Sequence, residues 1–232
     1  MRIIAIIPAR SGSKGLKDKN IKELNGTPMM AYTIEAANSC GIFDCVHVST
    51  DSEKYADIAR KYGADVPFLR SQEMSSDTAD SWDAVLEVLN RYKGLEKEFD
   101  MVTLLQPTSP IRTGEDIKNA FNIFIAKDAN AVISVCESDH PIEWYRPLLN
   151  DNDMSAFATS EEKSGRRQDA DTYYRMNGSI YMLNTTYLKE NPRNIIRNKV
   201  YAYIMDKYSS IDIDTQFDFD IAEAVIKKMN CW

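Results

Sequence analysis

The sequence predicts an α/β protein with a mostly parallel, doubly wound sheet and helices on both of its faces. Short apolar segments rich in β-branched residues recur along the chain, and segments with helical periodicity lie between the early ones. Several of the apolar segments are continuous rather than alternating, which is typical of strands buried on both faces. No repeat or Pro/Gly-rich linker divides the 232 residues, so we expect one domain over 1–232.

Strands are expected where short runs are apolar and β-branched. These runs are Ile3–Ile7, Val46–Ser49, Met101–Leu105, Ala131–Val135, Ser179–Leu183 and Val200–Met205. Helices are expected where apolar residues recur at helical spacing. These segments are Pro28–Ser39, Ser52–Tyr62, Ser81–Tyr92, Glu115–Ala126 and Thr215–Met229. The first of them begins with a proline, which suits the first turn of a helix.

The stretch from about 137 to 175 interrupts this alternation of strands and helices. It contains His140-Pro141, a polar run at Asn150–Asp153 and the charged segment Ser160–Asp169. We therefore expect an insertion or a protruding arm between the fourth and fifth main strands.

Charge and composition limit the classes of partner. The chain carries 28 basic and 35 acidic residues, a net charge of −7 at pH 7, which argues against binding to nucleic acid or to anionic membranes. Its four cysteines lack the spacing of a metal site or a disulfide framework. The N-terminal apolar run is far shorter than a signal sequence or a membrane span. We expect a soluble, cytoplasmic protein with reduced cysteines.

The segment that follows the first expected strand is rich in glycine and positive charge. Residues 7–15 read IPARSGSKG, and Lys17 and Lys19 follow. Glycines let backbone N–H groups turn toward a ligand, and Arg10, Lys14 and Lys19 supply positive charge, a combination that suits a polyphosphate. The segment matches neither G-x-x-x-x-G-K-[ST] nor G-x-G-x-x-G. Phosphate binding is the hypothesis, and an ordinary solvated loop is the alternative.

An acidic segment precedes the last expected helix. Asp212 and Asp214 alternate with Ile211 and Ile213, and this period of two places both carboxylates on the same side of an extended chain. Two such carboxylates repel each other unless a cation neutralises them, and Mg²⁺ takes one or two carboxylates together with phosphate oxygens and waters. A magnesium site is therefore the hypothesis. A solvated turn that caps the last helix is the alternative.

Three further motifs carry polar groups suited to a ligand. LLQPTSPIR, 104–112, presents Gln106 and Thr108 on a chain that two prolines stiffen, although a rigid strand-to-helix connection explains it equally well. RRQD, 166–169, offers arginine forks for a carboxylate, with a solvated charged face as the alternative. In NGSIY, 177–181, Gly178 suits either close ligand approach or a bulge.

In this order, these motifs closely resemble those of the acylneuraminate cytidylyltransferases, also called CMP-sialic acid synthetases, including the enzymes that activate legionaminate and pseudaminate. The set comprises IPARSGSKG with Lys19-Asn20, STDS at Ser49–Ser52, LLQPTSPIR, RRQD, NGSIY and SSIDIDTQFDF, and it spans nearly the whole chain. The resemblance implies a Rossmann-like domain of the nucleotide-diphospho-sugar transferase type. It also implies a homodimer, with approximately 137–175 as an arm for dimerisation and substrate binding.

The resemblance implies a Mg²⁺-dependent reaction of CTP with an acidic nine-carbon sugar, giving the CMP-sugar and pyrophosphate. It implies catalytic roles for Arg10, Lys19, Asp212 and Asp214, the last two as metal ligands. The implied nucleotide-binding positions are Ala9, Arg10, Ser11, Gly12, Ser13, Lys14, Gly15, Lys19, Asn20 and Ser81. The implied sugar-binding positions are Gln106, Thr108, Arg166, Arg167 and Gln168, the last three reaching into the partner's site.

Other functions remain open from the sequence. Asp212-Ile213-Asp214 also has the D-x-D form with which metal-dependent glycosyltransferases hold a nucleotide-sugar, although a loop suited to a triphosphate argues against that enzyme. A Kdo cytidylyltransferase and a non-catalytic nucleotide sensor are further alternatives. The choice among N-acetylneuraminate, legionaminate and pseudaminate also stays open.

Overall fold

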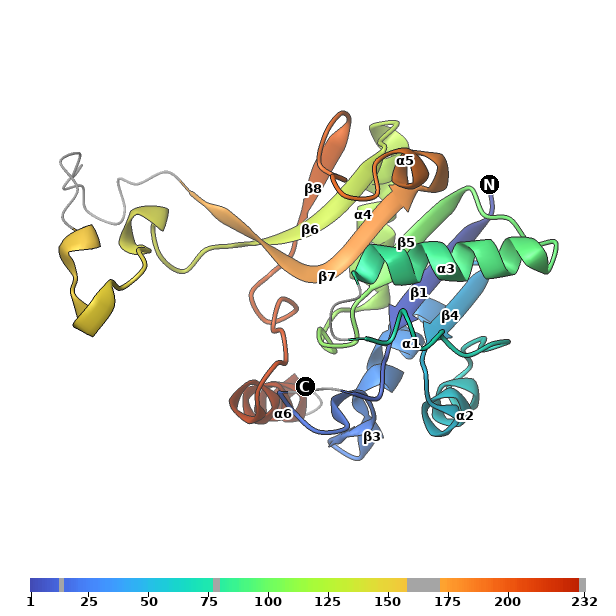
Figure 1. Ribbon diagram of the computed structural model, residues 1–232, viewed down its shortest axis with the longest axis horizontal. Coiled ribbons are helices and arrows are strands. Elements are labelled where there is room, and N and C mark those ends of the chain that lie inside the picture. Colours follow the sequence, from blue (N-terminus) through green and yellow to red (C-terminus); the bar gives the residue numbers. More distant parts are fainter. Residues whose placement is uncertain (13–14, 77–79, 158–171, 230–232) are drawn as a thin grey trace.

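The computed structural model describes residues 1–12, 15–76, 80–157 and 172–229, and its centre is a mixed sheet of six strands (Figure 1). The strands of this sheet are β1 (Ile3–Pro8), β4 (Cys45–Ser49), β5 (Met101–Leu105), β6 (Ala131–Glu137), β7 (Tyr174–Asn184) and β8 (Val200–Ile204). A small hairpin consists of β2 (Glu23–Leu24) and β3 (Thr27–Pro28). The helices are α1 (Met29–Ser39), α2 (Glu53–Lys61), α3 (Ser81–Gly94), α4 (Gly114–Ala126), α5 (Thr185–Glu190) and α6 (Gln216–Met229). Short 3₁₀ turns occur at Lys19–Ile21, Ile142–Trp144, Asn150–Asn152 and Ser155–Phe157.

The strand order is β4-β1-β5-β7-β6-β8. Strand β1 pairs in parallel with both β4 and β5, and β6 pairs in parallel with β8, whereas β7 lies antiparallel to β5 and β6. The chain passes from β1 outward to β4 and then returns past β1 to β5, so the winding reverses between β1 and β5. In open α/β sheets ligands bind at such a switch point, beyond the carboxyl ends of the strands.

Helices cover both faces of the sheet (Figure 1). On one face, α1, α2 and α4 pack Met30, Ile34, Tyr55 and Ile117 against the sheet. On the other face, α3 and α5 bury another apolar cluster that contains Val85, Val88, Tyr92, Tyr187 and Leu188. A third cluster joins α6 to the hairpin through Leu24, Ile213, Phe219 and Ile226. The predicted α/β layering is therefore confirmed.

The expected elements are all present, with one strand running in the unexpected direction. Each of the six predicted strands and five predicted helices overlaps an observed element. Strand β7 begins at Tyr174, five residues before the expected start, and runs antiparallel to its neighbours. The β2–β3 hairpin and α5 were not expected from the sequence, because each is too short to give a periodic signal.

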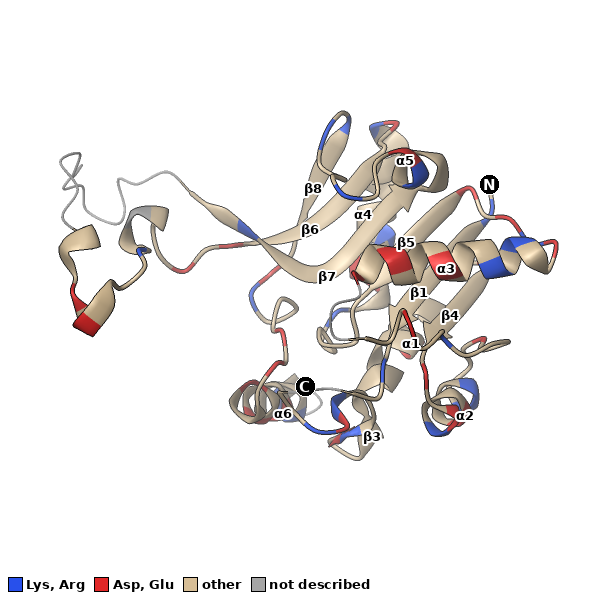
Figure 2. Ribbon diagram, in the orientation of Figure 1, with Lys and Arg blue, Asp and Glu red and all other residues tan. Residues whose placement is uncertain are grey.

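A protruding arm leaves the sheet between β6 and β7, as expected (Figure 1). Glu137 pairs with Tyr174 in the ladder, so the chain enters and leaves the arm at neighbouring positions. The described part of the arm carries charged residues, which Figure 2 shows in red and blue, and it also exposes many large apolar side chains. These are Ile142, Trp144, Tyr145, Leu148, Leu149 and Met154, joined at its base by Tyr174 and Met176.

Among the described residues, no helix is long and apolar enough to cross a bilayer.

Candidate functional site

A cleft of about 610 Å³ lies beyond the carboxyl ends of β1 and β5, at the switch point of the sheet. Its walls come from the loop after β1, residues 70–76 and 80–84, the loop after β5 and the acidic segment before α6. The lining contains Pro8, Arg10, Gly15, Lys19, Asn20, Arg70, Met74, Ser76, Asp80, Ser81, Ala84, Gln106, Pro107, Thr108, Asp214 and Thr215. The fold thus brings together three motifs that were singled out separately, and it adds a fourth segment that was not.

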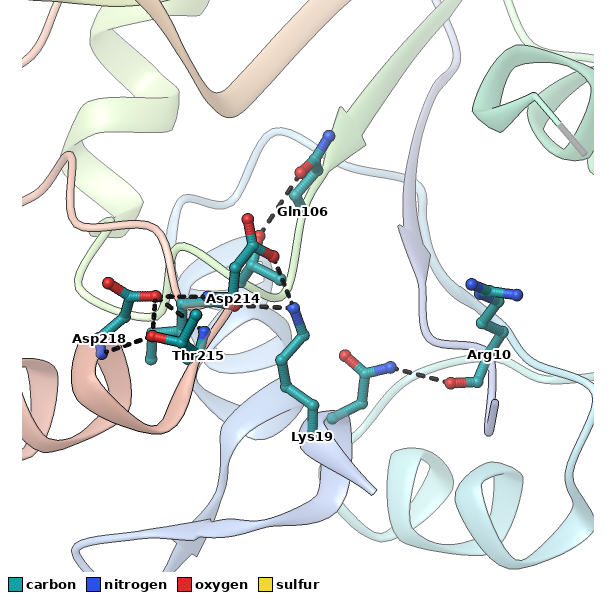
Figure 3. Close-up of polar contacts among 9 residues, drawn as sticks. Arg10, Lys19, Gln106, Asp214, Thr215 and Asp218 are labelled. Atoms are coloured by element: carbon teal, nitrogen blue, oxygen red, sulfur yellow. Dashed lines mark hydrogen bonds and ion pairs between the residues drawn. The ribbon is translucent and has the colours of Figure 1, made fainter. Parts of the chain in front are cut away.

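Lys19 and Asp214 meet at one side of the cleft (Figure 3). The Nζ of Lys19 donates to Asp214 Oδ1 at 2.9 Å and to the carbonyl oxygen of Ile213 at 2.7 Å. Asp218, near the start of α6, accepts from the backbone N–H groups of Asp214 and Thr215 and thereby caps the helix. The lysine of the basic loop and a carboxylate of the acidic segment are therefore in direct contact at the cleft.

Arg10 lies apart from this pair, and Figure 3 shows its guanidinium turned away from Lys19. Its backbone carbonyl accepts a 3.1 Å hydrogen bond from Nδ2 of the buried Asn20. Its Nη1 lies 3.5 Å from the carbonyl oxygen of Ser75, in the segment that forms another wall of the cleft. Two cationic side chains of one loop therefore reach the cleft at separate points, as a chain of phosphate groups would require.

Ser11 is engaged by Asp51, which follows β4. Its backbone N–H donates to Asp51 Oδ1 at 2.8 Å and its hydroxyl donates to Oδ2 at 3.0 Å. Ala9 is fully buried and continues the pairing of β1 with β4 through a bond from its N–H to Ser49. Both residues shape the loop in this structure, and their assignment as nucleotide contacts stays a prediction, as does that of the exposed Gly12.

The loop approaches the acidic segment most closely at Gly15. A Cβ at this position would lie 2.6 Å from the carbonyl oxygen of Asp214, closer than nonbonded atoms can approach. Glycine is needed here because of this backbone contact.

Asp212 lies deeper than Asp214. Its side chain is half-buried, and its Oδ1 has no hydrogen-bond partner among the described residues. Burial raises the pKa of Asp212, a hydrogen bond from Thr108 opposes that rise, and the nearby charge of Asp214 adds to it. Ile213 between them enters the apolar cluster under α6, so both carboxylates are kept out of that cluster.

This donor set fits a magnesium ion. No cluster of three or more His, Cys, Asp or Glu side chains suited to a metal occurs in the described ranges. Mg²⁺ needs only one or two carboxylates when phosphate oxygens and waters supply the other ligands. A buried carboxylate oxygen without a partner and a second carboxylate nearby meet that need.

Gln106 forms another part of the wall. Its side chain lies next to Gly178, and its backbone carbonyl is bonded to Arg112. Gly178 has φ of +76°, and a Cβ there would lie 3.3 Å from Gln106 Oε1. The buried Arg112 donates through Nη1 to the carbonyl oxygens of Gln106 at 3.2 Å and Ser179 at 2.8 Å. Burial lowers the pKa of Arg112 to about 9, and its Nε and Nη2 find no partner among the described residues.

Ser81 opens α3 at the rim of the cleft, next to the capping residue Asp80. Ser13, Lys14, Arg166, Arg167 and Gln168 lie outside the described residues. Their proposed roles therefore rest on sequence alone.

Sequence reasoning missed Arg70, which supplies a further guanidinium to the cleft. It donates to Ser49 Oγ at 3.0 Å and to the Ser49 carbonyl at 2.9 Å. Burial lowers its pKa, the charges of Asp51 and Glu87 oppose this, and Arg10 is close enough to lower it further. No motif surrounds Arg70 in the sequence, and only the fold brings it beside Arg10.

Comparison with known proteins agrees with this geometry. Residues 4–230 match the family model described as cytidylyltransferase. The N-acylneuraminate cytidylyltransferase of Escherichia coli O18:K1:H7 is 40% identical over 230 residues, which cover 99% of this chain and 53% of that protein. The chain thus spans about half the length of that relative. The CMP-N,N'-diacetyllegionaminic acid synthase of Legionella pneumophila is 36% identical over 234 residues, covering 98% of this chain and 97% of that protein.

A solved structure shares the fold. It is a CMP:2-keto-3-deoxy-manno-octonic acid synthetase complexed with CTP, with a TM-score of 0.73 and 15% identity, and the match covers 99% of this chain and 100% of that one. The expected Rossmann-like fold and the resemblance stated from the motifs are both confirmed. With a family match over 4–230 and a relative of nearly equal length at 36% identity, the chain belongs to the cytidylyltransferase family.

Proposed function

We propose that the chain transfers CMP from CTP to the anomeric hydroxyl of a sialic-acid-like nonulosonic acid and releases pyrophosphate, with Mg²⁺ as the cofactor. The observation that carries this proposal is the meeting of the basic loop and the acidic segment at Lys19 and Asp214, in a cleft that also receives Arg10 and Gln106. The names of the relatives, an N-acylneuraminate cytidylyltransferase and a CMP-legionaminic acid synthase, support the class of sugar.

The reaction concentrates negative charge on the leaving group. The sugar hydroxyl attacks the α-phosphorus and gives up its proton to solvent, while the bond from this phosphorus to the bridging oxygen breaks and pyrophosphate leaves with the electron pair. Arg10 and Lys19 reach the cleft at separate points, so they can bind the phosphate chain and stabilise the charge that develops. Asp212 and Asp214 would hold Mg²⁺, which, when bound, neutralises charge on phosphate oxygens.

The sugar is proposed to bind on the side of Gln106 and Thr108. Gln106 presents an amide to the cleft, and Tyr181 lies near Asp212, whose charge contributes to the raised pKa of the phenol after burial. Arg166, Arg167 and Gln168 are proposed to complete the sugar site from a partner subunit. A carboxylate on the substrate is the chemical feature that an arginine fork would read.

A homodimer formed through the arm is the second part of the proposal, within a single domain over 1–232. The exposed apolar residues of the described arm include Trp144 at 58% and Leu148 at 56% exposure. Apolar surface of this extent, on a segment that stands off the domain, favours a protein partner. Replacing Leu148 and Leu149 together by aspartate should convert a dimer into monomers in sedimentation experiments, and a monomeric wild-type protein would exclude this assembly.

The cytoplasm is the proposed location. Cys40, Cys45 and Cys136 are buried thiols without disulfides, and thiols persist in reducing compartments.

The experiment that tests the function is pyrophosphate release from CTP and Mg²⁺ with N-acetylneuraminate, legionaminate, pseudaminate or Kdo, each with Asp212→Asn as the control. Release with one nine-carbon sugar, lost in the variant, is the expected result and names the substrate. Release with Kdo alone would show that the substrate is Kdo and not a nine-carbon acid sugar. Binding of CTP without release on any sugar would favour a nucleotide sensor, and hydrolysis of a nucleotide-sugar instead would favour a glycosyltransferase.

A further inference from the structure

A buried polar network lies between the base of the arm and the acidic segment, and Asn177 of β7 is at its centre. Oδ1 of Asn177 accepts from Ser134 Oγ at 2.6 Å and from the Ser179 N–H at 3.2 Å. Its Nδ2 donates to Ser210 Oγ at 2.9 Å, with Met205 Sδ at 3.3 Å. Asn177, Ser134 and Ser210 are each at most 2% exposed.

The network depends on a bulge in the β6–β7 ladder. The register shifts between Ile133 and Val135, opposite Gly178 with its positive φ. Ser134 Oγ accepts from the Ile180 N–H at 2.7 Å and so replaces the ladder bond that the bulge removes. The bulge turns the Asn177 side chain away from the ladder and toward Ser210.

Ser210 transmits this contact to the acidic segment. Its hydroxyl accepts from Asn177 and donates to the carbonyl oxygen of Asp206 at 2.6 Å, so every member of the chain has a compatible donor or acceptor role. The Ile211 N–H closes a local turn on the Tyr208 carbonyl at 3.3 Å, and the next anchor to another segment is the Ile213 N–H, which donates to the Thr108 carbonyl at 2.8 Å. Asp212 lies between Ser210 and Ile213; Thr108 bonds to its side chain, and its Oδ1 has no hydrogen-bond partner among the described residues.

We infer that Asn177 is a positioning residue for the two carboxylates, acting through Ser210 to fix the segment that carries Asp212 and Asp214. The effect on metal affinity rests on the proposed function, whereas the effect on the segment itself does not. Partners that orient metal ligands typically change metal affinity by about 10–100-fold when they are removed. Asn177 does not line the cleft, so its loss should act on the metal and leave metal-free nucleotide binding in place.

The test compares the full-length chain with Asn177→Ala, Ser210→Ala and the double variant. Tyr187→Phe is the matched control, because it removes a buried 3.2 Å hydrogen bond to the Ile195 carbonyl at the other end of β7. Two quantities are measured. The first is amide hydrogen exchange over 211–214. The second is the Mg²⁺ concentration at which CTP affinity, measured by calorimetry, shows half of its Mg²⁺-induced increase. Affinity for CTP in EDTA is measured in parallel.

We expect faster exchange over 211–214 and about a tenfold higher Mg²⁺ requirement in both single variants, with CTP affinity in EDTA within about twofold of wild type. The double variant should be no worse than Asn177→Ala, because the two residues act as one unit. Tyr187→Phe should change neither quantity. If Asn177→Ala does not fold, Ser210→Ala carries the same comparison.

Unchanged exchange in Ser210→Ala would overturn the positioning role. If CTP binding by the wild type responds to Mg²⁺, an unchanged Mg²⁺ requirement in the variants would overturn it as well. If CTP binding by the wild type does not respond to Mg²⁺ at all, the proposed cofactor fails. The exchange measurement then still decides whether Asn177 positions the segment.

Discussion

The Nζ of Lys19 lies 2.9 Å from Oδ1 of Asp214, although 195 positions separate the two residues in the chain. The lysine side chain is 12% exposed and the aspartate side chain 74% exposed. An ion pair open to water on one side contributes little to stability, about 0–1 kcal/mol. The pair therefore matters for placement, because it sets a cation beside a carboxylate in the cleft, where the proposed phosphate and metal ligands would bind.

Removing one cation of the basic loop should slow the reaction strongly. Loss of a preorganised donor typically costs about 2.7–4 kcal/mol of barrier, so Arg10→Ala is expected to lower kcat roughly 10²–10³-fold. Lys19→Met should behave similarly. Lys17→Ala is the matched control, because Lys17 is an exposed cation of the same loop that does not line the cleft. Pyrophosphate release measures all three, and equal losses in Lys17→Ala and Arg10→Ala would contradict the assignment.

Neutralising either carboxylate of the acidic segment should affect the metal requirement. We expect Asp212→Asn and Asp214→Asn to lower turnover at least as much as Arg10→Ala and to weaken Mg²⁺ binding. Asp220→Asn, an exposed neighbour that pairs with Gln216 within α6, is the control and should retain both. Mg²⁺ titration of activity and calorimetry with CTP give the two readouts. A wild-type turnover that persists in EDTA would refute the metal requirement.

Gly178→Ala separates backbone strain from a specific contact. Both Gly178 and Gly26 have positive φ, +76° and +80°, so alanine should cost about 1–2 kcal/mol of stability at either site. Only at Gly178 would the new Cβ press on Gln106, since Gly26 has no atoms within 4 Å. We expect similar losses in urea unfolding but a raised sugar KM only for Gly178→Ala. An unchanged KM in a folded Gly178→Ala protein would remove Gln106 from the proposed sugar site.

His47 should make stability depend on pH. Burial, followed by the charges of Arg70 and Arg91, lowers the pKa of His47 from 6.5 to about 3. Between these values the unfolded chain binds a proton that the folded chain does not, so the free energy of unfolding rises with pH. The contribution of His47 to the slope of this free energy against pH approaches about 1.4 kcal/mol per pH unit between the two pKa values, and it falls to zero above the unfolded value of 6.5.

His47→Gln removes this titration, so the slope between pH 5 and pH 6.5 should fall relative to wild type in urea unfolding. The matched control is His140→Gln, which replaces the second of the two histidines. Identical slopes in wild type and His47→Gln would show that the imidazole does not titrate as its burial requires.

Much of the fold followed from local patterns, because buried strands and amphipathic helices leave clear periodic signals. Strand β7 shows the limit. Residues 179–183 were predicted as a strand, but apolar residues look the same in parallel and antiparallel pairing, so its direction was not. Its extension to Tyr174 was missed because Tyr174, Arg175 and Met176 are exposed and lack a buried pattern.

The candidate site was predictable wherever residue type itself carries the chemistry, as for Lys19, Asp212 and Asp214. Arg70 was not found, since nothing near it in sequence marks a ligand and its place beside Arg10 depends on packing. The link from Asn177 to Ser210 joins residues 33 positions apart through a bulge. Sequence patterns suggested a bulge at Gly178 as one option, but they gave no sign of its partner.

The arm begins and ends at the paired residues Glu137 and Tyr174 of neighbouring antiparallel strands. Its root is therefore a hairpin stem, and inserting or removing chain beyond the stem need not alter the register of the sheet below. A hybrid that carries the arm of a relative on this domain should therefore keep the sheet and the cleft at its carboxyl edge unchanged. With the arm in its proposed sugar-binding role, such an exchange would let sugar preference diversify separately from the use of CTP, in a family whose members are named for different acid sugars.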